Sequence, residues 1–132
     1  MAAQVSVKAF FSKPSGGTPP PHNVFELAPV TRSANLITPA RGALEALLGN
    51  VTLSEEAHGF LRLDAAGLSI GDLTIHNGTA SVDFFSGGAK SWAGDLSPVT
   101  FKQAVEKTLQ QFPTVQHVTV KVDGKANFDS LQ

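Results

Sequence analysis

The sequence contains no cysteine, and this absence excludes several kinds of site at once. Disulfide bonds, zinc–thiolate centres and thiol nucleophiles all require cysteine, so none of them contributes to the stability or chemistry of this chain. The absence leaves the redox compartment open, because a chain without cysteine is suited to both reducing and oxidising surroundings.

An excess of basic charge is missing as well. Ten Lys and Arg residues are offset by eleven Asp and Glu residues, which gives a formal net charge of -1, and no Lys/Arg run occurs. Binding to nucleic acid depends on basic side chains that neutralise phosphates. The composition therefore gives this class of function little electrostatic support.

Long apolar stretches are also absent. No segment approaches the roughly 18 apolar residues that read as a membrane-spanning helix, and residues 1–4 (MAAQ) lack the apolar core of a signal peptide. Two alternatives follow: the protein is cytoplasmic, or this chain is a piece cut from a longer one. A strand pattern that begins at Val5 favours the cut piece.

The residues that are present describe one globular domain. Of the 132 residues, 42% are hydrophobic and 16% charged, which is typical of a folded chain of single-domain size. We expect a core over about residues 5–124 and a short C-terminal tail over 125–132.

Hydrophobic periodicity predicts seven main elements. Strands are expected at 5–12, 24–34 and 115–122, helices at 38–49 and 97–112, and a hairpin of two strands at 68–85, with loops at 13–23 and 86–95. A further short helical turn is expected at 54–58. The order β-β-α-β-β-α-β, with one apolar face per element, predicts an α+β two-layer sandwich with two helices on one face of a mixed sheet.

Residues at the ends of these elements support the assignment. Thr38 and Pro39 are typical of a helix start and Gly49 of a helix end. Asn77-Gly78, between two alternating runs, is the strongest hairpin signal in the chain. Pro29 removes a backbone donor and so predicts an edge position or a bulge in its strand.

Five segments in this order resemble the sporulation and spore germination domain family, also called GerMN domains. They are "VKAFFS", "LAPVTR", "ALEALLGN" with "SEEAHG", "GLSIGDLTIHNGTASVDFFS" and "AVEKTLQQFPTVQHVTVKVDG". The resemblance covers nearly the whole chain, from about Val5 to Gly124. The family's usual Gly-Pro after the first helix is Gly49-Asn50 here.

The resemblance implies an extracytoplasmic module of the bacterial cell envelope, often part of a lipoprotein, with any membrane anchor lying outside this chain. It also implies a fold similar to the ring-building motifs of secretin-type assemblies. No catalytic residues are assigned to the family, so the resemblance implies none here.

The residues themselves supply no catalytic, cofactor-binding or metal-binding set. The four histidines are His22, His58, His76 and His117, and none has the spacing of a metal motif. His76 and His117 would meet only if their strands were neighbours. Glu55 and Glu56 are adjacent and would diverge on a helical turn, whereas acid–base work needs facing carboxylates.

Three aromatic residues are the candidate partner surface: Phe10, Phe85 and Trp92. If Phe11 and Phe84 face the helices, strand alternation turns Phe10 and Phe85 to the open face of the sheet. Exposed aromatic clusters often anchor interfaces. The alternative is that loop 13–23, or the tail with Phe128, folds over these rings.

Two functional hypotheses follow. The first is a non-enzymatic module that binds a protein partner or copies of itself in the cell envelope. The second is a domain that binds a small molecule or a cell-wall glycan, with loops 13–23 and 86–95 forming a mouth where Trp92 stacks on a sugar ring.

Overall fold

A computed structural model describes residues 4–14, 25–35, 39–63, 65, 67–86 and 97–124 of the chain. Within these ranges the elements follow the predicted order, including the short helical turn expected at 54–58. They are β1 (Gln4–Pro14), β2 (Phe25–Asn35), α1 (Pro39–Leu48), α2 (Leu53–Ala57), β3 (Ser69–His76), β4 (Thr79–Phe85), α3 (Ser97–Leu109) and β5 (His117–Val122).

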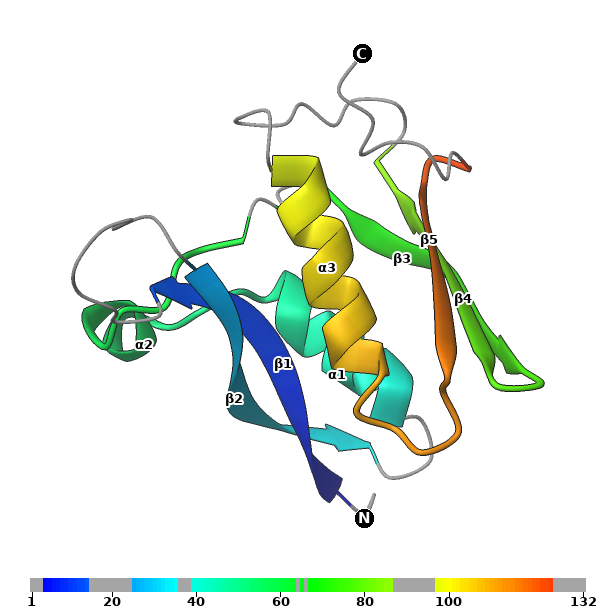
Figure 1. The fold of residues 1–132 in the computed structure, drawn as a ribbon, viewed down its shortest axis with the longest axis horizontal. Helices are drawn as coiled ribbons and strands as arrows, with labels where there is room; N and C mark the ends of the chain where they lie inside the picture. Colours follow the sequence, from blue (N-terminus) through cyan, green and yellow to red (C-terminus); the bar gives the residue numbers. More distant parts are fainter. Residues whose placement is uncertain are drawn as a thin grey trace.

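The described strands form two sheets. β1 and β2 pair in antiparallel fashion, while β3, β4 and β5 form a second sheet in that order, with β3–β4 antiparallel and β4–β5 parallel. Helices α1 and α3 lie between the two sheets (Figure 1). The α+β class and the two helices on one face of a mixed sheet are confirmed, but the expectation of a single sheet was wrong.

The division into two sheets has a physical cause at the outer edge of β1. The Lys8 N–H donates to Oε1 of Gln111 at 2.9 Å, and Nε2 of Gln111 donates back to the Lys8 carbonyl at 2.5 Å. The Phe10 N–H donates to Oγ1 of Thr108 at 3.1 Å. The side chains of Thr108, in α3, and Gln111, just after α3, thus occupy the position of a neighbouring strand along β1. Because these backbone groups of β1 are already satisfied, β1 cannot join the larger sheet.

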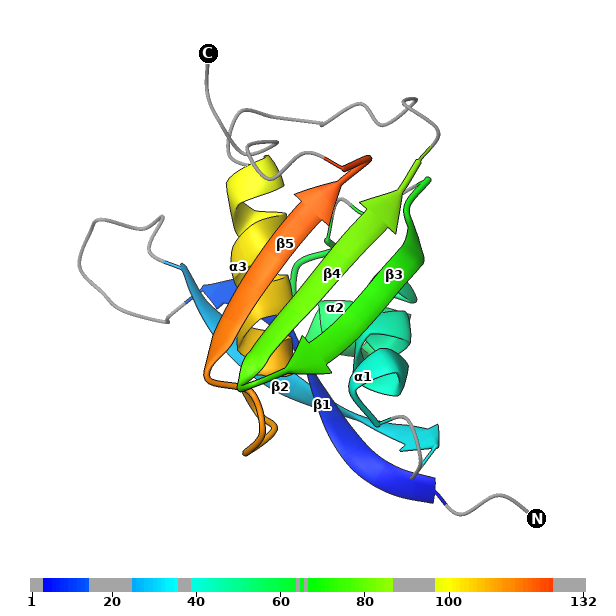
Figure 2. The same cartoon turned by 90° about the vertical axis from the view of Figure 1, so that its right-hand side faces the viewer.

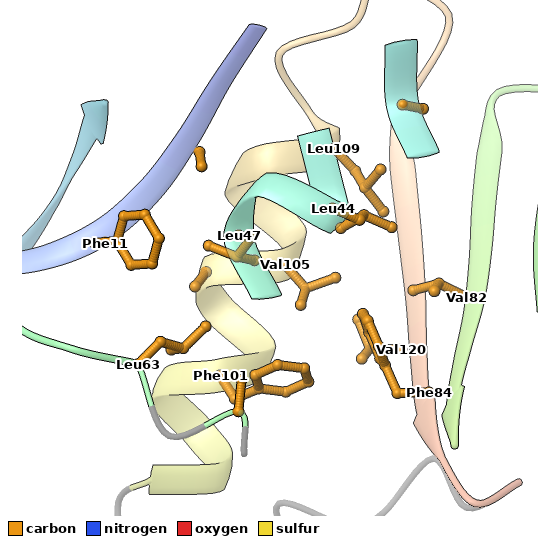
Figure 3. Close-up of a cluster of buried hydrophobic side chains, with 14 of the residues drawn as sticks. Phe11, Leu44, Leu47, Leu63, Val82, Phe84, Phe101, Val105, Leu109 and Val120 are labelled. Carbon is orange, nitrogen blue, oxygen red and sulfur yellow. The ribbon is translucent and has the colours of Figure 1, made fainter. Parts of the chain in front are cut away.

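The core lies where the two helices meet both sheets (Figure 3). Phe84 of β4 and Phe101 of α3 are fully buried and pack edge to face, with ring centroids 5.0 Å apart. This geometry matches the preference of the aromatic quadrupole. Phe11, Leu44, Leu47, Val82, Val105, Leu109 and Val120 extend the same cluster across β1, α1, α3, β4 and β5.

Helix α3 ends at Leu109, three residues before the predicted end. Nε2 of Gln111 donates to the Thr108 carbonyl at 2.6 Å, and the Phe112 N–H donates to the Leu109 carbonyl at 3.2 Å. In a continuing helix the Phe112 N–H would bond to Thr108 instead. The Gln111 side chain therefore both closes the helix and binds β1.

Helix α1 ends near Gly49 as predicted, but Asn50 makes the turn. Asn50 adopts a φ of 70°, in the left-handed region that Asn tolerates better than most residues. Its side chain accepts a hydrogen bond from the Leu63 N–H at 2.9 Å and donates to the Leu63 carbonyl at 2.7 Å. Asn50 therefore ties the end of α1 to a segment thirteen residues away.

Two predictions about backbone geometry are confirmed. Asn77 and Gly78 have φ values of 52° and 80° and connect His76 directly to Thr79 across the β3–β4 hairpin. Pro29 lies on β2, which has β1 on one side and no second strand among the described residues. A residue without an N–H costs no ladder bond at such an edge.

Helix α2 is held by one ion pair and one capping box. Its N-cap is Thr52: the Glu55 N–H donates to Oγ1 of Thr52 at 3.1 Å, and the Thr52 N–H donates to Oε1 of Glu55 at 2.9 Å. Arg32 of β2 donates to both carboxylate oxygens of Glu55, at 2.6 and 2.7 Å. This bidentate pair fixes α2 against the β1–β2 sheet.

Replacing Gln111 by Ala should destabilise the fold more than replacing its neighbour Gln110, which is exposed. Gln111→Ala removes the side-chain bonds to Lys8 and Thr108, and we expect a loss of about 1–2 kcal/mol in the free energy of unfolding. Gln110→Ala should change it by less than about 0.5 kcal/mol. Urea unfolding measures both, and equal losses in the two variants would contradict the role assigned to Gln111.

Acid should remove the contribution of Glu55 to stability. Hydrogen bonding to Arg32 lowers the pKa of Glu55 from 4.5 to about 2. A carboxyl whose pKa is lower in the folded chain stabilises the fold above its unfolded pKa, and this contribution is lost as the pH falls from 4.5 towards 2. Glu55→Gln should therefore cost about 1–3 kcal/mol at pH 7 and almost nothing near pH 2.

Glu56→Gln is the control for this experiment, because Glu56 pairs at 3.0 Å with Arg62, whose side chain is 57% exposed. An exposed pair of this kind contributes little. Urea titrations at a series of pH values give the two profiles. A pH-independent difference between wild type and Glu55→Gln would show that packing, not charge, explains the effect.

Candidate interaction surface

The structure places Phe10 and Phe85 on different sheets. Phe10 lies on β1 and Phe85 at the end of β4, so the expectation that they share one open sheet face was wrong. The reason is the division described above: alternation assigns each strand two faces but does not say which strands share a sheet. Trp92, the third predicted residue, lies outside the described residues.

Phe10 is half-buried beside α3. The Nζ atom of Lys107 lies 5.8 Å from the centroid of its ring, within the range of a cation–π contact. The Phe10 N–H is also bonded to Thr108. Phe10 therefore contributes to the contact between β1 and α3, and only part of its ring faces outward.

Phe85 is 59% exposed on the face of the larger sheet that no described element covers. It lies beside Gly71, where a β-bulge interrupts the pairing of β3 with β4. A Cβ atom at Gly71 would come within 3.4 Å of the Cβ atom of Phe85. An aromatic residue beside a strand glycine shields the bare backbone, and no described element covers the rest of this ring.

Figure 2 shows the larger sheet with this face towards the viewer. By the strand register, the rest of the face is polar, and its residues form rows across the strands. One row is Asp72, Asp83 and Lys121, the next is Thr74, Ser81 and Thr119, and the last is His76, Thr79 and His117. His76 and His117 are thus separated by β4 and do not meet. The face offers charge and hydroxyl groups around Phe85, but no converging set of catalytic groups among the described residues.

A groove of about 420 Å³ lies between β3, an edge strand of the larger sheet, and α1, on the helix side of that sheet. It is lined by Pro39, Ala40 and Arg41 of α1, Leu73 and Ile75 of β3, and Phe112 and Thr114 after α3. Ile75 is 40% exposed there although its pattern predicts a core position. Sequence reasoning missed this groove, because the pattern of alternation does not reveal that β3 is an edge strand.

The acidic pair at Glu55 and Glu56 diverges as predicted. Glu55 is bound by Arg32 and Glu56 by Arg62. A carboxylate that is held ionised by a bidentate Arg is a poor proton donor near neutral pH. These residues stabilise the α2 segment rather than form a site for acid–base chemistry.

Among the helices that the structure describes, none is long and apolar enough to cross a membrane.

Comparison with solved structures gives the fold of a known group of proteins. The chain matches the tandem GerMN domains of the sporulation protein GerM from Bacillus subtilis with a TM-score of 0.67 and 17% identity, over 93% of this chain and 40% of that one. The first GerMN domain of the same protein matches with a TM-score of 0.61 and 22% identity, over 92% and 84%.

A putative lipoprotein from Clostridium perfringens matches with a TM-score of 0.50 and 12% identity, over 93% of this chain and 77% of that one. No curated protein matches the chain significantly. The family model for sporulation and spore germination, named Germane, matches residues 8–128. The chain therefore belongs to the Germane family of sporulation and spore germination domains, as the sequence resemblance predicted.

Proposed function

We propose that this domain is a non-enzymatic protein-interaction module of the bacterial cell envelope. Phe85 carries the proposal: it is a large aromatic side chain, 59% exposed, on a sheet face that no described element covers. A few residues contribute most of the binding energy in a protein interface, and aromatic side chains are enriched in interface cores. The acidic pair that could have suggested an enzyme is engaged in ion pairs instead.

The location in the envelope is supported by the relatives. One solved relative is a putative lipoprotein and another is a sporulation protein with two GerMN domains in tandem. The present chain spans 40% of that tandem structure, so the activity and partners of the whole protein are not transferred to it. Repetition of a domain is common in proteins that bind others through several contacts.

Binding of a small molecule or a cell-wall glycan remains the alternative hypothesis from the sequence. It depends on Trp92 and on loops 13–23 and 86–95, which lie almost entirely outside the described residues. The described residues supply an exposed phenylalanine on a flat sheet, and this arrangement favours a protein partner over an enclosed ligand.

Phe85→Ser should weaken capture of envelope proteins by the immobilised domain while leaving it folded. Loss of one aromatic anchor costs about 1–2 kcal/mol or more, which corresponds to roughly a tenfold loss of affinity. Quantitative mass spectrometry of proteins retained from an envelope extract measures this change, and the thermal midpoint reports folding.

Leu53→Ser is the matched control, because Leu53 is 84% exposed and lies on α2, away from the sheet face. It should retain the same proteins as the wild type. Equal capture by Phe85→Ser and wild type would contradict the proposal. If Phe85→Ser unfolds the chain, the ring belongs to the core and the surface role is also wrong.

A further inference from the structure

The outer edges of β1, β2 and β3 differ in how their backbone groups are satisfied. Gln111 and Thr108 bond to the edge of β1, and the Leu61 N–H donates to the Ser12 carbonyl on the same edge at 2.9 Å. On β2, Pro29 has no N–H to offer, and Arg32 donates to the Thr31 carbonyl. Such devices prevent an edge from pairing with another chain.

The edge of β3 has no such protection among the described residues. The two-residue turn makes His76 and Thr79 a hydrogen-bonded pair, and pairs alternate along an antiparallel ladder. The N–H and C=O groups of Leu73 and Ile75 therefore point away from β4, and no described residue bonds to them. Among the described residues, these groups form an open template for one more strand.

The groove of about 420 Å³ borders this free edge. An added strand would place alternate side chains over the helix side of the sheet, next to Leu73, Ile75 and Phe112. The groove gives those side chains an apolar environment that a bare edge lacks. This combination of a strand edge and adjoining pockets is how β-strand addition obtains both affinity and specificity.

On the face of the sheet away from the helices, the charges beside the β3 edge favour a positively charged side chain on an added strand. Asp72 of β3 lies directly across from Asp83 of β4, and such like-charge pairs are unfavourable. On the far side of β4, Lys121 lies across from Asp83, but no described residue forms an ion pair with Asp72. A cationic side chain on an added strand would supply the missing neighbour.

The shape of the edge favours a single added segment over a whole second domain. Figure 2 shows α1 projecting past β3 on the side away from β4. A second copy that continued the sheet would bring its own helices against α1, whereas one extended chain fits between β3 and α1. Helix α1 thus forms the far wall of the groove, with Pro39, Ala40 and Arg41.

Building on the proposed interaction role, we propose that an extended segment of a partner protein pairs antiparallel with the free edge of β3. Two apolar residues of this segment lie opposite Ile75 and Leu73 and enter the groove, and a Lys or Arg follows opposite Asp72. Read from its N-terminus, the added segment therefore needs an apolar residue, any residue, a second apolar residue and then a Lys or Arg. The pairing adds hydrogen bonds to Leu73 and Ile75 and relieves the repulsion between Asp72 and Asp83.

A peptide with the sequence of residues 116–122, QHVTVKV, is a suitable probe because it carries this pattern in Val118, Val120 and Lys121. We expect it to bind the folded chain and to shift the backbone amide resonances of Leu73 and Ile75 in nitrogen-15 NMR spectra. The same peptide with Lys121→Glu should bind about tenfold more weakly, because attraction to Asp72 becomes repulsion.

Reversing the charge on the protein completes the test. Asp72→Lys should lose affinity for the original peptide and gain it for the Lys121→Glu peptide. This exchange locates the contact, since a peptide that displaced β5 would meet Asp83 instead and would not respond to Asp72→Lys. Asp72→Lys also replaces a like-charge pair within the sheet, so the variant should fold at least as well as the wild type.

Methylation of single peptide nitrogens separates strand pairing from simple charge attraction. In the proposed register the N–H groups of Val118 and Val120 face β3, and that of Thr119 faces away. N-methylation at Val118 or Val120 should abolish binding, whereas N-methylation at Thr119 should be tolerated.

Three results would overturn the inference: no amide shifts on β3 at about 1 mM peptide, equal binding of the two peptides to wild type, or equal effects of methylation at Val118 and Thr119. Analytical sedimentation of the chain without peptide can give a fourth result that would overturn it. Concentration-dependent assembly that Asp72→Lys abolishes would make a second copy the occupant. If the peptide fails while Phe85→Ser still loses envelope partners, the interaction role stands and only the β3 site is wrong.

Discussion

The bonds between α3 and the edge of β1 determine the architecture. Thr108 lies on the buried side of α3 and Gln111 just beyond its end, and both bond to the β1 backbone. A strand edge that is satisfied by side chains cannot accept another strand, so β1 and β2 stay separate from the larger sheet. The two helices are then enclosed on both sides, which explains how 132 residues bury so continuous a core.

The same constraint decides where the molecule remains open. With β1 closed by Gln111 and β2 interrupted by Pro29, the unsatisfied strand edges among the described residues lie on the larger sheet, whose outer strands are β3 and β5. No described element covers the sheet face around Phe85, because both helices lie on the opposite face. The β3 edge and the sheet face around Phe85 are therefore left open because both helices pack into the core between the two sheets. Among the described residues, no added loop forms these surfaces.

Much of this fold could be predicted because local signals and core patterns agree. Asn77-Gly78 specifies a turn with two positive φ values, and the apolar stripe of α3 corresponds to buried residues such as Phe101 and Leu109. The number of sheets could not be predicted, because alternation identifies the buried face of a strand but not its neighbours. The role of Gln111 was hidden for a related reason: its partner Lys8 is 103 positions away.

The candidate site was less predictable than the fold. Phe85 was found because an aromatic residue stood on the polar side of an alternating strand. Phe10 satisfied the same rule, yet it packs beside Lys107, since its strand faces a helix at its edge. The groove beside Ile75 was missed for the opposite reason: an apolar residue on the core side of an edge strand looks buried in sequence. Partner surfaces on such a domain depend on which edges the fold leaves unpaired, and that property belongs to the topology and not to any motif.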